Sequence, residues 1–181
     1  DDILISGPGA VEDDYSPAVA YSPAANQWLV VWSDGRNYDE RDDDIYGRRV
    51  RAMGGLAKSD FRVSSRTGVK GEGVPDIAYN SDADEFLVVW LDRRLGSRDI
   101  FGQRVPGIGP KIGGNFRISR STGDEGGPSA VYNPDAGQYL VVWHDDRNNE
   151  TRGGDIFGRR VTAAGTPVDK DFRVCGVADK G

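Results

Sequence analysis

The sequence holds little of the chemistry that usually marks an enzyme or a metalloprotein. Its 181 residues include one cysteine, one histidine and one methionine. A single cysteine excludes an intrachain disulfide and a cysteine-based zinc site, and a single histidine excludes two-histidine metal motifs. The sequence motifs of P-loops, zincin proteases and serine hydrolases are missing as well. The chain therefore offers no recognisable catalytic signature.

Long apolar runs and positive charge are also scarce. No stretch approaches the roughly 18 consecutive apolar residues of a membrane-spanning helix, so no membrane span is expected. Lysine and arginine number 23 against 29 aspartates and glutamates, and the net charge of −6 argues against nucleic acid as a partner. The abundant residues are glycine, with 25 copies, and the aromatics, with 4 Trp, 7 Tyr and 6 Phe. This composition predicts a soluble, turn-rich globular chain.

The dominant feature of the sequence is a repeat that occurs three times. One block reads aromatic-Leu-Val-Val-Trp-x-Asp-x-Arg and occupies 28–36, 86–94 and 139–147. A second, Asp-Ile-aromatic-Gly-x-Arg-Val, occupies 44–50, 99–105 and 155–161. A third, beginning Phe-Arg, occupies 61–64, 116–119 and 172–175. The distance from the Trp to the Gly of the second block is 15, 12 and 15 residues, so length varies chiefly between these two blocks.

Each repeat predicts four short strands, named A to D in chain order. Strand B, the Leu-Val-Val-Trp run, is apolar on both faces, as expected for a strand buried between two other sheets. No segment has a sustained 3.6-residue apolar period, so essentially no helix is expected. Four-stranded antiparallel units stacked face to face are the blades of a β-propeller. The predicted fold is all-β, with three four-stranded antiparallel blades of β-propeller type at 15–64, 73–119 and 127–175.

Residues 1–14 are predicted to form a leading strand and a linker. Ile3 lies 14 residues before Pro17, as Phe61 lies 14 before Pro75, which predicts one extra N-terminal strand of type D. Propellers typically have four to eight blades, so three blades do not close in the usual way. Three alternatives follow: the chain is part of a longer array, two copies form a homodimer that completes a six-bladed ring, or three blades close or stack unusually.

Aspartates recur at the end of strand B and at the start of strand C. They admit a structural interpretation, in which each closes a turn and is held by an arginine. They also admit a functional one, in which carboxylates at strand ends bind Ca²⁺ as the cofactor. The candidate metal ligands are Asp34, Asp44, Asp92, Asp99, Asp145 and Asp155.

Candidate ligand-binding residues come from aromatic positions and from departures from the repeat. The aromatic that opens strand B lies near a strand end, where partial exposure is expected. Tyr15 and Tyr38 are the two aromatics outside the repeat positions, and His144 replaces the Ser and Leu of the other copies. The candidates are Trp28, Phe86, Tyr139, Tyr38 and His144.

The first two blocks resemble repeats of secreted and cell-surface bacterial and archaeal proteins, and more distantly TolB/WD40-like propeller blades. The resemblance covers about residues 15–175. It implies an extracellular or cell-surface location and a binding or scaffold role, and it carries over no catalytic residue. The Asp-box of sialidases, Ser-x-Asp-x-Gly-x-Thr-Trp, is not matched, because Ser33-Asp34-Gly35 has no counterpart in the other copies.

The leading functional hypothesis is a non-enzymatic binding or scaffold module of a secreted or surface protein. It would recognise a glycan or protein partner through the loops between strands B and C and between strands D and A, where sequence freedom is concentrated. One alternative is a glycan-active hydrolase or a fragment of one. Another is a calcium-stabilised structural repeat array.

Overall fold

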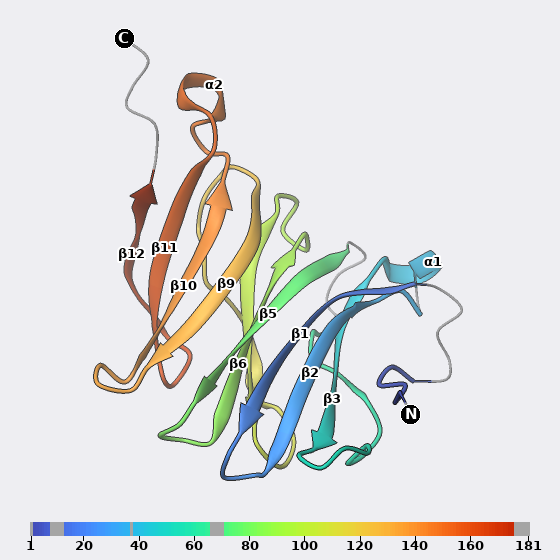
Figure 1. The fold of residues 1–181 in the computed structure, drawn as a ribbon. Coiled ribbons are helices and arrows are strands. Elements are labelled where there is room, and N and C mark those ends of the chain that lie inside the picture. The colour runs from blue at the N-terminus through green and yellow to red at the C-terminus, as the bar shows by residue number, and fades with distance from the viewer. Residues whose placement is uncertain (1, 8–12, 37, 66–70, 176–181) are drawn as a thin grey trace.

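The computed structural model describes residues 2–7, 13–36, 38–65 and 71–175, and these form three four-stranded antiparallel sheets (Figure 1). The first sheet contains β1 (Asp14–Ser22), β2 (Gln27–Asp34), β3 (Asp44–Arg51) and β4 (Phe61–Arg62). The second contains β5 (Glu72–Asn80), β6 (Glu85–Asp92), β7 (Asp99–Pro106) and β8 (Ile112–Arg117). The third contains β9 (Glu125–Asn133), β10 (Gln138–Asp145), β11 (Asp155–Thr162) and β12 (Pro167–Cys175). The predicted architecture of three four-stranded blades is confirmed.

The blades are arranged so that their first strands are neighbours. Strand β1 lies against β5, and β5 lies against β9, which leaves blade 2 between blades 1 and 3. Within each blade the strands follow one another in chain order. Tight turns therefore suffice for most connections, which agrees with the glycine-rich composition.

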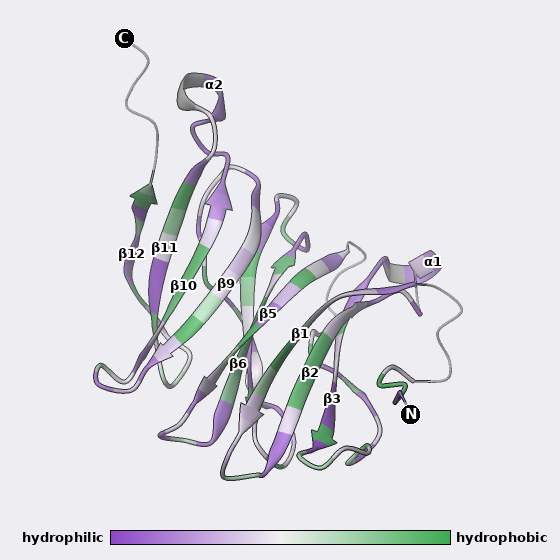
Figure 2. Cartoon of the chain, viewed as in Figure 1, coloured by the Kyte–Doolittle hydropathy of each residue, from purple (hydrophilic) through white to green (hydrophobic). Residues whose placement is uncertain are grey.

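Two hydrophobic cores fill the spaces between consecutive blades. One joins blades 1 and 2, and the other joins blades 2 and 3. All eight residues of β6 are buried, because this strand has a neighbouring sheet on each face. Figure 2 shows the same pattern, with apolar residues along the strands and polar residues in the connections. The apolar alternation on both faces of strand B therefore records the stacking of sheets.

The described residues outside the strands include two single turns of helix, α1 (Tyr38–Arg41) and α2 (Asn149–Arg152). Both lie between strands B and C, in the two blades where that connection is longer. In blade 2, whose connection is three residues shorter, the chain makes only turns. The expectation of essentially no helix holds apart from these two turns. Within the described part of the chain, no helix is long and apolar enough to cross a membrane.

The N-terminal segment departs from the predicted extra strand. Residues 3–6 are described but do not form a strand. The reason is physical: a strand of type D pairs with a strand C, and β3 already pairs with β4. The segment is instead held by a bond from Arg48 Nη1 to the Ile5 carbonyl, 2.9 Å long, and by a side-chain bond between Ser6 and Asp14. Residues 8–12 of the predicted linker lie outside the described residues.

Candidate functional site

The repeated Trp-x-Asp-x-Arg sequence forms the same buried clasp in each blade. Side chains two residues apart in a strand lie on one face, so the indole Nε1 of the Trp reaches the Asp carboxylate, over 2.9, 3.0 and 3.2 Å in blades 1 to 3. The arginine Nε donates to the same carboxylate over 2.7, 2.8 and 2.8 Å. The carboxylates belong to Asp34, Asp92 and Asp145, all 0% exposed.

Each clasp arginine also covers an aromatic ring of strand C. The guanidinium carbon lies 3.9, 4.4 and 3.7 Å from the ring centroid in blades 1 to 3, close enough for a cation–π interaction. The pairs are Arg36 with Tyr46, Arg94 with Phe101 and Arg147 with Phe157. This clasp ties strand B to strand C, so its residues have a structural role in every copy.

The aspartates that open strand C are held by arginines of strand D. Arg117 Nη2 lies 2.6 Å from Asp99 Oδ1, and Arg62 contacts Asp44 in the same way. In blade 3 the Nε of Arg173 lies 3.3 Å from Asp155.

All six aspartates predicted as calcium ligands are thus paired with an arginine, whose positive charge disfavours a cation at the same oxygens. The described residues contain no group of three His, Cys, Asp or Glu side chains that could hold a metal ion. Both observations favour the structural interpretation of these aspartates.

The aromatics at the start of strand B differ in accessibility. Phe86 and Tyr139 are 1% and 0% exposed, and each packs against a tyrosine of the preceding strand within its blade. They lie in the junctions between blades and have no surface on which a ligand could stack. Trp28 is 39% exposed, because no blade covers its face of blade 1.

His144 lies on the exposed face of blade 3. Its Nε2 is 3.5 Å from Asp146 Oδ1, and both side chains are exposed to solvent. It shares β10 with Tyr139, which is buried on the opposite face of the sheet, whereas Trp28 and Tyr38 belong to blade 1 and Phe86 to blade 2. The predicted set of five candidates therefore does not form one site.

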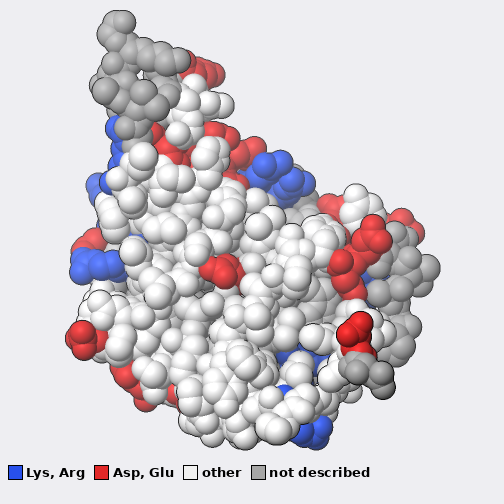
Figure 3. Space-filling model, viewed as in Figure 1, with Lys and Arg blue, Asp and Glu red and all other residues white. Residues whose placement is uncertain are grey.

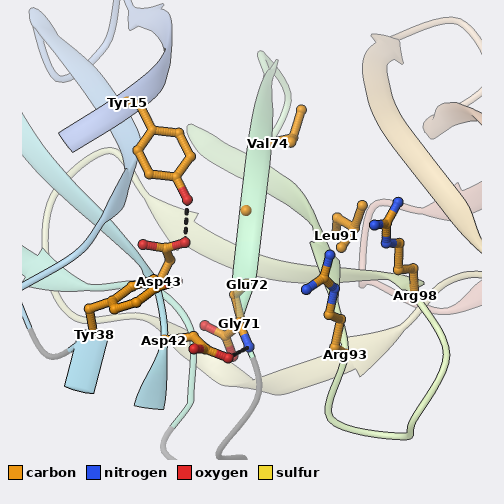
Figure 4. Close-up of a pocket in the computed structure, with 11 residues that line it drawn as sticks. Tyr15, Tyr38, Asp42, Asp43, Gly71, Glu72, Val74, Leu91, Arg93 and Arg98 are labelled. Carbon is orange, nitrogen blue, oxygen red and sulfur yellow. Dashed lines mark hydrogen bonds between the residues drawn. The ribbon is translucent and has the colours of Figure 1, made fainter. Parts of the chain in front are cut away.

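One cavity brings together residues that the repeat does not explain. It has a volume of about 340 Å³ and lies where blades 1 and 2 meet, at the end of the molecule that carries α1. Tyr15 from β1 and Tyr38 from α1 line one side (Figure 4). Arg93 and Arg98, from the loop between β6 and β7, lie on the opposite side. These side chains thus come from β1 and from the connections between strands B and C of blades 1 and 2.

The acidic side chains of blade 1 fix the tyrosine side of the cavity. The Tyr15 hydroxyl donates to Asp43, and the Gly71 amide donates to Asp42 Oδ2 over 3.0 Å. Burial, followed by the hydrogen bond to Asp43, raises the pKa of Tyr15, so this phenol remains neutral. The result is an aromatic wall whose ring position is set by a hydrogen bond.

Glu72 lies at the base of the cavity, between the tyrosine and arginine sides (Figure 4). It is 6% exposed, and its Oε1 accepts from Arg94 Nη2 over 3.1 Å. Its Oε2 is buried without a hydrogen-bond partner. Burial raises the pKa of Glu72 to about 8, so the carboxyl is largely protonated at neutral pH. A neutral carboxyl can donate a hydrogen bond to a ligand.

The sequence held part of the signal for this site. Tyr15 and Tyr38 stand out because they have no counterpart in the other two repeats. The sequence does not predict that these two residues, 23 positions apart, lie side by side, because their proximity depends on how the loop containing α1 turns back over β1. Arg93 and Arg98 lie in the connection that differs in length from those of the other blades, but no motif marks them.

Comparison with known proteins identifies the fold of the chain but assigns it to no family. No family model matches the chain, and no curated protein matches it. Among solved structures, it is similar to the Hadza microbial sialidase Hz136, with a TM-score of 0.67, 10% identity, and coverage of 92% of this chain and 38% of that one.

Two arabinofuranosidases are also similar. For the GH62 α-L-arabinofuranosidase of Coprinopsis cinerea the TM-score is 0.55 at 12% identity, covering 96% of this chain and 56% of that one. The α-L-arabinofuranosidase of Lactobacillus brevis has a TM-score of 0.55 at 9% identity, covering 88% and 53%.

These similarities define the fold class as blades of β-propeller type, which agrees with the sequence. At 9–12% identity they show the fold alone. The chain spans 38–56% of the length of these solved structures. Similarity specifically to TolB or WD40 repeats stays a prediction.

Proposed function

We propose that this chain is a glycan-recognition module of β-propeller type whose ligand occupies the cavity between blades 1 and 2. The observation that carries the proposal is the convergence of Tyr15 and Tyr38, the two aromatics outside the repeat, on that cavity. Rings exposed at a cavity wall provide apolar faces against which a sugar packs. Arg93, Arg98 and the carboxyl of Glu72 provide hydrogen bonds for hydroxyl groups.

The similar solved structures support the glycan as ligand class. Their printed names describe a sialidase and arabinofuranosidases, proteins that act on glycans. A location outside the cell, either secreted or at the surface, belongs to the same proposal. It rests on the resemblance of the repeats to those of secreted and surface proteins.

Binding of a panel of soluble oligosaccharides, measured by titration calorimetry or chemical-shift changes, tests the proposal. Tyr38→Ala is expected to weaken binding at least about fivefold, because an anchoring aromatic contributes more than about 1 kcal/mol. Met53→Ala is the control, since Met53 is 97% exposed and lies outside the cavity. A loss of binding in Trp28→Ala with none in Tyr38→Ala would place the ligand on the open face of blade 1 and overturn the cavity site.

A second candidate, a glycan-active hydrolase, is favoured by one specific observation. Glu72 is a protonated carboxyl at the cavity, as the proton donor in glycoside hydrolysis must be, and the Asp42 and Asp43 carboxylates line the same cavity. Turnover of chromogenic glycosides tests this function. Glu72→Gln is expected to abolish turnover, whereas Glu125→Gln, the same position in blade 3 and outside the cavity, leaves it unchanged. Binding without turnover by the wild-type chain rejects the hydrolase.

A further inference from the structure

The two junctions between blades are built from the same two faces. In each, a leucine–valine face of one blade packs against an aromatic face of the next. Between blades 1 and 2 the leucine–valine face consists of Leu29, Val31, Ile45 and Val63, and the aromatic face is centred on Phe86, Val88 and Trp90. Between blades 2 and 3 the corresponding residues are Leu87, Val89, Ile100 and Ile118, and Tyr139, Val141 and Trp143.

Blade 3 has the leucine–valine face with no blade against it. Its residues are Leu140, Val142, Ile156 and Val174, at the positions that form this face in blades 1 and 2. Leu140, Ile156 and Val174 are 36%, 37% and 55% exposed, whereas their six counterparts in blades 1 and 2 are all 0% exposed. The sequence thus keeps a junction surface here although nothing in the described chain covers it.

Blade 1 has the complementary aromatic face with no blade against it, although its Trp32, the counterpart of Trp90 and Trp143, is 4% exposed beside residues 3–6. Trp28 is 39% exposed, whereas its counterparts Phe86 and Tyr139 are buried. Val19 is 56% exposed, and Ile77 at the same position of blade 2 is 7% exposed. Figure 3 shows this side of the molecule with uncharged residues over much of its area, one acidic patch near its centre and other charged residues toward the rim.

We infer that two copies of the chain associate head to tail, with the leucine–valine face of blade 3 in each copy covering the aromatic face of blade 1 in the other. The contact reproduces a junction that the chain already forms twice, so it needs no new packing chemistry. Two such contacts related by a twofold axis close a ring. The ring has six blades, within the range of four to eight found in propellers, whereas three lie below it. The inference does not depend on the proposed function.

In the single chain, the N-terminal residues 3–6 occupy one edge of the aromatic face of blade 1. Ser6 bonds to Asp14 as Ser119 bonds to Glu125 at the junction of blades 2 and 3. Cys175 ends β12 at the position of Ser119, so in the ring Cys175 of one copy reaches Asp14 of the other. Residues 3–6 and the end of β12 therefore compete for this edge. Removing residues 1–6 is expected to strengthen the association.

Sedimentation velocity of the chain over a wide concentration range tests the inference. The expected species has twice the 19.7 kDa mass of one chain. Leu140→Glu and, independently, Val131→Glu are expected to give single chains, because each puts a charge on the open face of blade 3. Met53→Glu is the matched control: Met53 is 97% exposed in the turn after β3 and lies outside both faces. Circular dichroism and melting curves establish that each variant folds.

A mixing experiment distinguishes this geometry from other dimers. Leu140→Glu retains the blade 1 face, and Trp28→Glu retains the blade 3 face. Each alone is expected to be a single chain, and an equal mixture is expected to form pairs through one intact junction. A single-chain mass at every concentration overturns the inference and favours further blades as the occupant of both faces. A ladder of masses overturns closure, and pairs unaffected by Leu140→Glu overturn the assigned face.

Discussion

Loss of the Asp92 carboxylate is expected to lower the free energy of unfolding by about 3–5 kcal/mol, the cost of removing one partner from a buried ion pair. Asp92 is fully buried and the Arg94 side chain is 11% exposed. The carboxylate accepts from Trp90 Nε1 over 3.0 Å and from the Arg94 backbone amide and Nε over 2.9 and 2.8 Å. Asp92→Ala leaves these donors without their acceptor, and Arg94 without its nearest negative charge.

The measurement is urea unfolding of Asp92→Ala, Arg94→Met and the double variant. Each single variant leaves a buried charged group without its partner. The loss of unfolding free energy in the double variant is therefore expected to be smaller than the sum of the two single losses by at least about 1 kcal/mol. Asp135→Ala, at an exposed turn between β9 and β10, is the control and should change stability by less than about 0.5 kcal/mol. Additive losses in the double variant would refute the assignment of the clasp as a coupled unit.

Three further outcomes follow from the same structure. Val74 has a φ of 51° just before Pro75, and the corresponding residue in blade 3 is Gly127, with a φ of 53°. Because a β-branched residue is strained at a positive φ, Val74→Gly is expected to raise the free energy of unfolding by about 1 kcal/mol. A lower denaturation midpoint would contradict this. Burial raises the pKa of Glu72 to about 8 and of Glu125 to about 7, so the folded state holds protons that the unfolded chain releases near pH 4.5. The contribution of these two groups to stability is therefore complete below pH 4.5 and is lost as the pH rises toward 7–8. The denaturation midpoint of Glu125→Gln should accordingly depend less steeply on pH in this range than that of the wild-type chain. EDTA is expected to leave the melting temperature unchanged because arginines hold the six candidate aspartates; a fall in Tm would reveal a stabilising cation.

The sequence predicted the strands well because the repeat provides three readings of each element. A turn or strand that is ambiguous in one copy is clear in another, and a strand B apolar on both faces requires a sheet on each side. The pattern does not say which blades are present to cover those faces. Phe86 and Trp28 occupy the same repeat position, yet one is buried and the other is exposed. Exposure of these residues therefore depends on blade number, which local sequence does not encode.

The candidate site was predictable only in its parts. Tyr15 and Tyr38 were visible as departures from the repeat, but their meeting depends on the turn formed by α1. The raised pKa of Glu72 was beyond reach, because it comes from burial in the folded chain, which raises the pKa of the matched Asp14 and Glu125 as well. Side-chain roles shared by all copies follow from the repeat, whereas roles unique to one copy follow from loop geometry.

The uniform junction between blades has a consequence for how such a chain can change during evolution. Each blade presents its leucine–valine face to the next blade and its aromatic face to the preceding one. Duplication or deletion of a unit of 53–58 residues therefore leaves complementary faces at the new junction. Whole blades can be gained or lost without compensating core substitutions. The connections between strands B and C touch the next blade through backbone bonds, such as that from the Glu72 amide to the Asp43 carbonyl over 3.0 Å, and their side chains can then diverge separately in each blade. Loop sequence and blade number can therefore change independently of each other.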